Sequence, residues 1–120
     1  YSAALDLLHR ALAIAPGDVL IAGAIGAVLR KDGRLSEALA TLDRVVAAEP
    51  RHGAAWLERG YTLEAMRLEA AAGDSYRRAV AVDATLSPAW GRLADAAARR
   101  PSGSLSSAIS RVVMPGGMTS

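Results

Sequence analysis

The chain has 120 residues, of which 52% are hydrophobic but only 4% aromatic, and it contains no cysteine and no phenylalanine. Without cysteine it can hold neither a disulfide framework nor a thiolate metal site. A formal net charge of +2 is too small to drive association with nucleic acid. The length fits one modest domain, and apolar residues that are mostly alanine, leucine and valine favour closely packed helices.

The first two predicted helices cover about residues 1–15 and the stretch that follows Asp18. Asp18 precedes the longest apolar run, residues 19–29, and can cap the N-terminus of a helix there. That run is shorter than the roughly 20 residues that a membrane span needs. We therefore expect a packed helix, ended by Asp32-Gly33 with the glycine in the left-handed conformation.

The third predicted helix runs from Ser36, the expected N-cap, to Glu49. Its apolar residues recur at the spacing of one helical face. That face comprises Ala38, Leu39, Leu42, Val45 and Val46, and the opposite face comprises Glu37, Asp43 and Arg44.

The next stretch has two irregular positions. Arg67 occupies the turn that corresponds to Gly33, and Gly73 lies inside a predicted helix, where glycine costs about 1 kcal/mol relative to alanine. We expect a looser or bent helix near residues 69–75. Ser87 is the expected cap of the following helix, with Pro88 at its first position.

The last predicted element is a short amphipathic helix within residues 104–114, after Pro101 and before Pro115. Its apolar residues are Leu105, Ala108, Ile109, Val112 and Val113. Two interpretations stay open. The segment covers the last helix as a degenerate cap, which we favour because repeat arrays need an end piece, or it occupies a groove as an intramolecular ligand.

A repeat with a period of 34 positions organises the chain, and such repeats are the first feature to seek in a sequence. The positions that keep this period are Pro16 and Pro50, Trp56 and Trp90, Ala4, Ala38 and Ala72, and the small residues Gly26, Gly60 and Ala94. We expect each tryptophan to fill the gap between two helices while the small residue four positions later lets helices approach closely. A ligand-stacking role for the indoles is the alternative.

These residues resemble the tetratricopeptide repeat, whose pattern is Trp-x2-Leu-Gly-x2-Tyr, then Ala-x3-Phe, then Pro. The resemblance covers residues 1–100 and implies an all-α fold, a right-handed superhelical array of antiparallel helix-turn-helix repeats. It divides the chain into the second helix of a partial repeat (1–16), two whole repeats (17–50 and 51–84), the first helix of a third (85–100), and a capping helix with a tail (101–120). Ala22, Arg59 and Ala84 depart from the family's usual Trp, Leu and Pro.

The sequence offers no pattern that indicates catalysis, a metal or a cofactor. His9 and His52 have no nearby ligands at metal-binding spacing, and no pair of carboxylates suggests acid-base chemistry. The serines lie mainly in the tail, without a base beside them. We therefore expect a chain without catalytic residues, metal or cofactor.

The resemblance implies that the first helices of successive repeats line a concave groove for a peptide or helix of a protein partner. Carried over by position, the groove contains Leu20, Gly23, Ala27, Arg30, Lys31, Ala54, Leu57, Tyr61, Glu64, Ala65, Pro88, Gly91, Arg92, Asp95, Ala98 and Arg99. Most groove positions are small or apolar, so we expect an apolar or amphipathic partner segment with Tyr61 as its main contact. The carboxylate clamp that some family members use for chaperone C-termini is not expected, because only Arg92 fits its pattern.

The leading hypothesis is thus a protein-interaction scaffold that binds no nucleic acid and no membrane, with a cytoplasmic location favoured. A second interpretation is a recruitment module of a larger bacterial enzyme, such as a sulfotransferase, glycosyltransferase or oxygenase, with its catalytic domain outside this chain. A third is a self-assembling module, since about three repeats are needed to bury a continuous core. The sequence does not name the partner.

Overall fold

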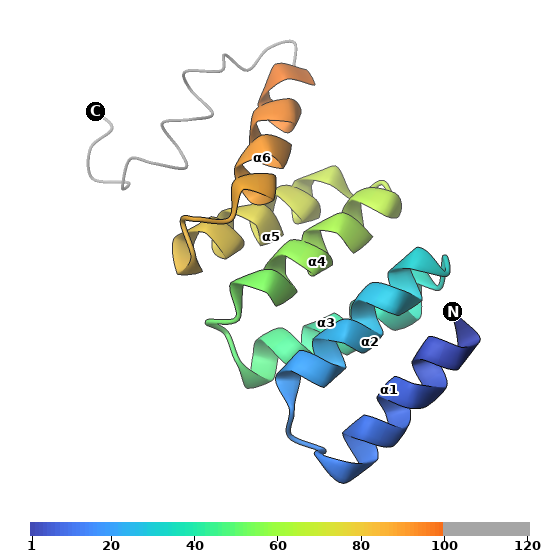
Figure 1. Ribbon diagram of the computed structural model, residues 1–120. Helices are drawn as coiled ribbons and strands as arrows, with labels where there is room; N and C mark the ends of the chain where they lie inside the picture. The colour runs from blue at the N-terminus through green and yellow to red at the C-terminus, as the bar shows by residue number, and fades with distance from the viewer. Residues whose placement is uncertain (100–120) are drawn as a thin grey trace.

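The computed structural model describes residues 1–99, which form six α-helices and no strand in that range (Figure 1). The helices are α1 (Ser2–Ile14), α2 (Val19–Lys31), α3 (Leu35–Ala48), α4 (Gly53–Ala65), α5 (Glu69–Val82) and α6 (Ser87–Arg99). The all-helical prediction is confirmed over this range. The amphipathic helix predicted within 104–114 lies outside the described residues. No helix in the described part of the chain is long and apolar enough to cross a membrane.

The helices stack as a succession of antiparallel pairs. Each helix packs against the next one along the chain, and α2 also packs against α4. In Figure 1, α2 and α4 lie on the near side, with α3 and α5 behind them. The first helices of successive repeats, α2, α4 and α6, therefore follow one another along one side of the array.

Helix starts agree with the sequence at Asp18 and differ at Ser36. The Asp18 carboxylate accepts hydrogen bonds from the backbone N–H groups of Leu20 (2.9 Å) and Ile21 (3.3 Å), so this cap is confirmed. The prediction at Ser36 is wrong, because α3 already begins at Leu35 and no side chain caps it.

An ion pair closes the first turn of α3 where a cap was expected. Arg34 donates through Nε and Nη2 to the two carboxylate oxygens of Glu37, at 3.0 and 2.8 Å. The hydrogen bond from Arg34 lowers the pKa of Glu37. Ser87 also lies inside its helix, as the first residue of α6, rather than at the cap position that the sequence predicted.

The C-terminal ends of α2 and α4 have the same geometry. Gly33 has φ of 82° and Arg67 has φ of 64°, both in the left-handed region. In each turn the next residue donates its N–H five residues back, from Arg34 to Leu29 and from Leu68 to Leu63, both at 2.9 Å. This is the Schellman arrangement, which confirms the predicted role of Gly33.

Two glycines allow the helices of each pair to approach closely. A Cβ placed on Gly26 would lie 2.7 Å from Leu42, and one placed on Gly60 would lie 2.3 Å from the ring of Tyr76. The two contacts are related by one period of the sequence. Each brings the first helix of a repeat against a buried side chain of the second helix, as the sequence predicted.

The core consists of three clusters of buried side chains that follow one another along the array. The predicted apolar face of α3 is confirmed: Ala38, Leu42, Val45 and Val46 are buried, and Leu39 packs at the edge of a cluster. Gly73 does not interrupt the helix expected near 69–75, because α5 runs continuously from Glu69 to Val82; the bend expected there stays a prediction. Helical hydrogen bonds and the packing of Ala72 and Tyr76 outweigh the weak propensity of Gly73.

The two tryptophans make the same hydrogen bond but differ in burial. The indole Nε1–H of Trp56 donates to the Pro50 carbonyl oxygen (2.7 Å), and that of Trp90 donates to the Ala84 carbonyl oxygen (2.9 Å). Trp56 also packs against two core clusters, as predicted for a side chain that fills an inter-helix gap. Trp90 is 37% exposed, so it does not fill such a gap among residues 1–99. Since the acceptor is a backbone carbonyl, replacing proline by alanine at position 84 leaves the bond intact.

Candidate functional site

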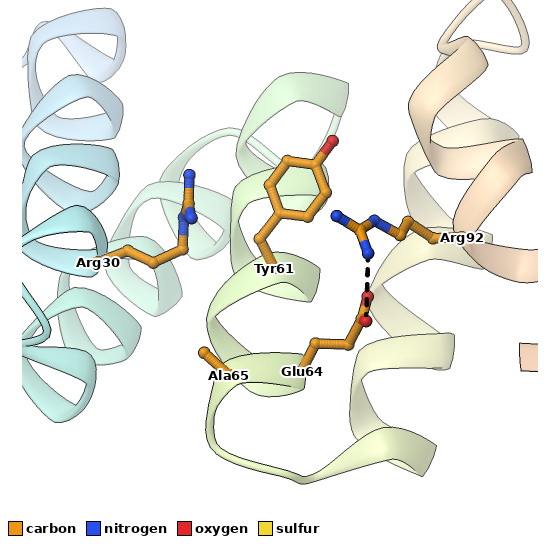
Figure 2. A pocket seen from close by; sticks show the side chains of 5 residues that line it. All are labelled: Arg30, Tyr61, Glu64, Ala65 and Arg92. Atoms are coloured by element: carbon orange, nitrogen blue, oxygen red, sulfur yellow. Dashed lines mark ion pairs between the residues drawn. The ribbon is translucent and has the colours of Figure 1, made fainter. Parts of the chain in front are cut away.

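The side of the array formed by the first helices contains a pocket of about 380 Å³. Its lining residues are Arg30 from α2, Tyr61, Glu64 and Ala65 from α4, and Arg92 from α6 (Figure 2). Three successive first helices therefore contribute to one site, although its residues are spread along the chain from position 30 to position 92.

Tyr61 stands at the centre of this pocket, between two arginines. The guanidinium carbon of Arg30 lies 5.2 Å from the centroid of the Tyr61 ring and that of Arg92 lies 5.3 Å from it. Figure 2 shows the ring between the two side chains. Both distances fall within the range of cation–π attraction. Tyr61 also contacts the Tyr76 ring edge-on, with centroids 6.0 Å apart.

Each of the two arginines has a carboxylate partner on a neighbouring first helix. Arg30 Nε lies 3.1 Å from Glu58 Oε2, and Arg92 Nη1 lies 3.6 Å from Glu64 Oε2. The two partners are the same number of residues apart in both pairs, but the order of the charges is reversed. The arginine comes first along the chain in one pair, and the glutamate comes first in the other. The lining itself holds two arginines and one glutamate, because Glu58 lies outside it. The Arg92 pair has the longer distance, and its arginine is the more exposed of the two.

Glu64 is held from a second side by Tyr76. The Tyr76 hydroxyl donates to Glu64 Oε1, and only 2% of the Tyr76 surface is exposed. Burial, followed by the hydrogen bond to Glu64, raises the pKa of Tyr76 well above its ordinary value. The phenol therefore stays protonated and fixes the orientation of a carboxylate in the pocket.

The structure brings together five of the residues predicted for the groove: Arg30, Tyr61, Glu64, Ala65 and Arg92. The other predicted positions do not line this pocket; they are Leu20, Gly23, Ala27, Lys31, Ala54, Leu57, Pro88, Gly91, Asp95 and Ala98. Of these, Leu57 packs against the core. The Arg99 side chain lies outside the described residues.

Two residues that orient the site were missed from the sequence. Glu58 pairs with Arg30, and Tyr76 binds Glu64. The sequence did contain a pattern that points to Glu58 as a partner of Arg30. Arg30 and Glu64 are one period apart and opposite in charge, and so are Glu58 and Arg92. A contact between successive first helices would thus pair opposite charges in both cases.

The chemistry of the pocket differs from the mainly small and apolar groove expected. Three of its five lining side chains are charged and a fourth is a phenol, because the arginines fold inward over Tyr61. Within residues 1–99, no group of three His, Asp or Glu residues is placed to hold a metal ion. The arrangement suits polar and aromatic contacts with a ligand.

The fold and the pocket define a class of protein, a helical repeat array with its pocket on the first helices. A family model described as tetratricopeptide repeat matches residues 1–58, and the helix-end hydrogen bonds and close contacts found there recur one period later. Over these residues the chain is similar to the tetratricopeptide repeat family. A search of curated proteins gave no match. Repeats of this family generally mediate protein–protein interactions and are typically non-catalytic.

Proposed function

We propose that this chain is an interaction scaffold that binds a segment of a partner protein on the side formed by α2, α4 and α6. The observation that carries the proposal is the pocket itself, in which Arg30, Tyr61 and Arg92 converge from three consecutive first helices. A ligand that spans these helices contacts all of them at once. Tyrosine and arginine are among the residues that dominate binding energy at protein interfaces.

The electrostatics of the pocket favour a segment with an acidic or amide side chain beside an apolar one. Arg92 is bound only loosely to Glu64, at 3.6 Å, and its side chain is 47% exposed, so it can turn to a partner carboxylate at small cost. Tyr61 offers its ring edge and hydroxyl, since the two guanidinium groups lie over the ring. We propose that the segment undergoes no reaction here and that the role is recognition.

The proposal is tested by selecting binding peptides from a displayed library against the whole chain. The affinities of the selected peptides are then measured by fluorescence anisotropy for the wild type and for Tyr61→Ala. We expect Tyr61→Ala to weaken binding at least tenfold, because removing a central aromatic contact typically costs about 2 kcal/mol or more, while far-UV circular dichroism stays the same.

The matched control is Leu7→Ala, which removes a side chain that is 65% exposed on α1, away from the pocket. It should leave peptide affinity unchanged. Peptides that bind the wild type and Tyr61→Ala equally well, or a selection that yields no binding peptide, would contradict the proposed function.

A further inference from the structure

A second pocket, of about 490 Å³, lies at the opposite end of α2, between α1, α2 and α3. Its volume falls within the roughly 300–1,000 Å³ of small-ligand sites. It shares no lining residue with the pocket around Tyr61. Ala22 lines it, and Ala22 precedes Trp56 by one period of the repeat. The first whole repeat therefore has a methyl group where the second has an indole.

The surroundings of Trp56 show what an indole requires at this position of a repeat. Its Nε1–H donates to the Pro50 carbonyl oxygen at 2.7 Å. The Arg78 guanidinium lies 5.1 Å from the ring centroid. Val46, from the preceding helix, belongs to one of the clusters that the ring packs against. The site thus supplies an acceptor for the N–H, a cation for the ring face, and an apolar wall.

The second pocket has a counterpart of each group. One period before Pro50, Arg78 and Val46 stand Pro16, Arg44 and Leu12, and all three line the pocket beside Ala22. Within residues 1–99, no hydrogen bond to the Pro16 carbonyl oxygen is observed. The acceptor, the cation and the apolar wall are therefore in place around an open volume.

Side-chain changes nearby do not fill this volume. Val45 stands at the position of Ala79, and Ile25 at that of Arg59, and both line the pocket as well. They make its walls more apolar than those around Trp56, because Ile25 replaces a guanidinium that lies 5.8 Å from the indole. The pocket thus offers an indole an apolar wall, a carbonyl acceptor and a cation.

We propose that the pocket beside Ala22 binds an indole ring supplied by a tryptophan side chain of a partner protein. The ring enters between α1 and α3, its N–H donates to the Pro16 carbonyl oxygen, and Arg44 lies over its face. This contact is separate from the one proposed around Tyr61 and does not depend on it. A cation over a ring and a carbonyl acceptor select indole over an aliphatic side chain of similar size.

The probe is N-acetyl-tryptophanamide, titrated into the whole isotope-labelled chain and followed by the backbone amide signals in NMR. We expect saturable shifts at Leu12, Ala22 and Val45 with a dissociation constant on the order of 1 mM, as for a small ligand with few contacts. N-acetyl-leucinamide should produce no saturable shift at these amides. Equal binding of the leucine amide, or no binding of the tryptophan amide, would overturn the proposal.

Ala22→Trp is the decisive variant, because it places an indole in the pocket from within the chain. It should weaken binding of N-acetyl-tryptophanamide at least tenfold and raise the midpoint of thermal unfolding by roughly 5 °C. The control Ala40→Trp adds an indole at an exposed position of α3 that does not line the pocket, and it should change neither value. Undiminished binding by a folded Ala22→Trp chain would refute the site.

Arg44→Ala keeps the proposal testable if Ala22→Trp does not fold. Arg44 is exposed, so its removal leaves the helices intact, and it should weaken binding about 2- to 5-fold by removing the cation. Unchanged affinity in Arg44→Ala would count against this placement of the ring. Free indole serves as a further probe, and saturable binding of indole without binding of N-acetyl-tryptophanamide would overturn the assignment to a protein side chain.

Discussion

At the scale of single residues, Arg67 is the clearest case of a residue whose type disfavours the backbone conformation that it adopts. It adopts φ of 64° in the turn after α4, where the equivalent turn after α2 has Gly33 at 82°. A side chain in the left-handed region costs about 1–2 kcal/mol, whereas glycine has no Cβ to clash. The hydrogen bonds of the two turns are nevertheless the same, so the repeat geometry overrides the local preference.

Arg67→Gly should therefore stabilise the fold by about 1 kcal/mol, less the extra entropy of glycine in the unfolded chain. Gly33→Ala should destabilise it by about 1 kcal/mol for the same reason. In the described part of the chain, no atom lies within 4 Å of a Cβ placed on Gly33, so the expected effect is one of backbone conformation. Urea unfolding followed by circular dichroism measures both. Two changes of the same sign would contradict the argument.

At the scale of helices, the sequence predicted which elements exist more reliably than where they begin. The repeat period and the apolar faces located all six helices, because both follow from burial that every repeat shares. Ser36 was a wrong cap because Arg34 and Glu37 close that turn with an ion pair, which side-chain identity alone does not reveal. Gly73 leaves α5 uninterrupted, because Ala72 and Tyr76 on the same helix pack into the core.

The contact between α4 and α5 gives a test of how tightly a helix pair is packed. Gly60→Ala should destabilise the chain by on the order of 1–2 kcal/mol, although alanine is the better helix former by about 1 kcal/mol. The reason is that the new methyl group would lie 2.3 Å from the Tyr76 ring, which is buried and held by Glu64. The measurement is again the free energy of unfolding in urea.

Gly91→Ala is the matched control, since Gly91 lies in α6 and no atom of residues 1–99 lies within 4 Å of a Cβ placed on it. It should stabilise the chain by up to about 1 kcal/mol through helix propensity alone. If Gly60→Ala were as stabilising as Gly91→Ala, the close approach of α4 and α5 would not constrain the structure.

At the scale of the whole molecule, the candidate site depends on contacts between repeats, and this decides how much of it was predictable. The resemblance to the tetratricopeptide repeat implied that Arg30, Tyr61, Glu64 and Arg92 lie on one side of the array. It did not reveal that the arginines fold over Tyr61, because that depends on the spacing of α2, α4 and α6. The pocket beside Ala22 could not be predicted either. The sequence shows that alanine stands where the repeat usually has tryptophan, but it does not show whether neighbouring side chains occupy the volume of the indole.

The stability of the whole array should fall at alkaline pH because of Tyr76. The folded state raises the pKa of this phenol above its ordinary value of 10.0, so above pH 10 the folded chain binds more protons than the unfolded one. Its contribution is therefore fully present below pH 10 and is lost as pH rises further, by about 1.4 kcal/mol per pH unit at most.

Tyr76→Phe should remove this part of the decline while costing about 1 kcal/mol at pH 7 through the lost hydrogen bond to Glu64. Urea unfolding between pH 7 and pH 11 compares it with the wild type and with Tyr1→Phe, a change at a residue 64% exposed. Tyr1→Phe should follow the wild-type curve. An identical alkaline decline in Tyr76→Phe would show that another group causes it.

The reversed ion pairs, Arg30 with Glu58 and Glu64 with Arg92, mean that the two whole repeats are not interchangeable modules. A tandem duplication of residues 51–84 would set Glu64 of one copy against Glu58 of the next, two like charges at a junction that now joins opposite ones. Duplicating residues 17–50 would leave Arg30 facing alanine, the residue at position 24. Reordering or adding repeats therefore requires changing the charged residues at each contact between successive first helices. The present charges fit only the present order of the repeats.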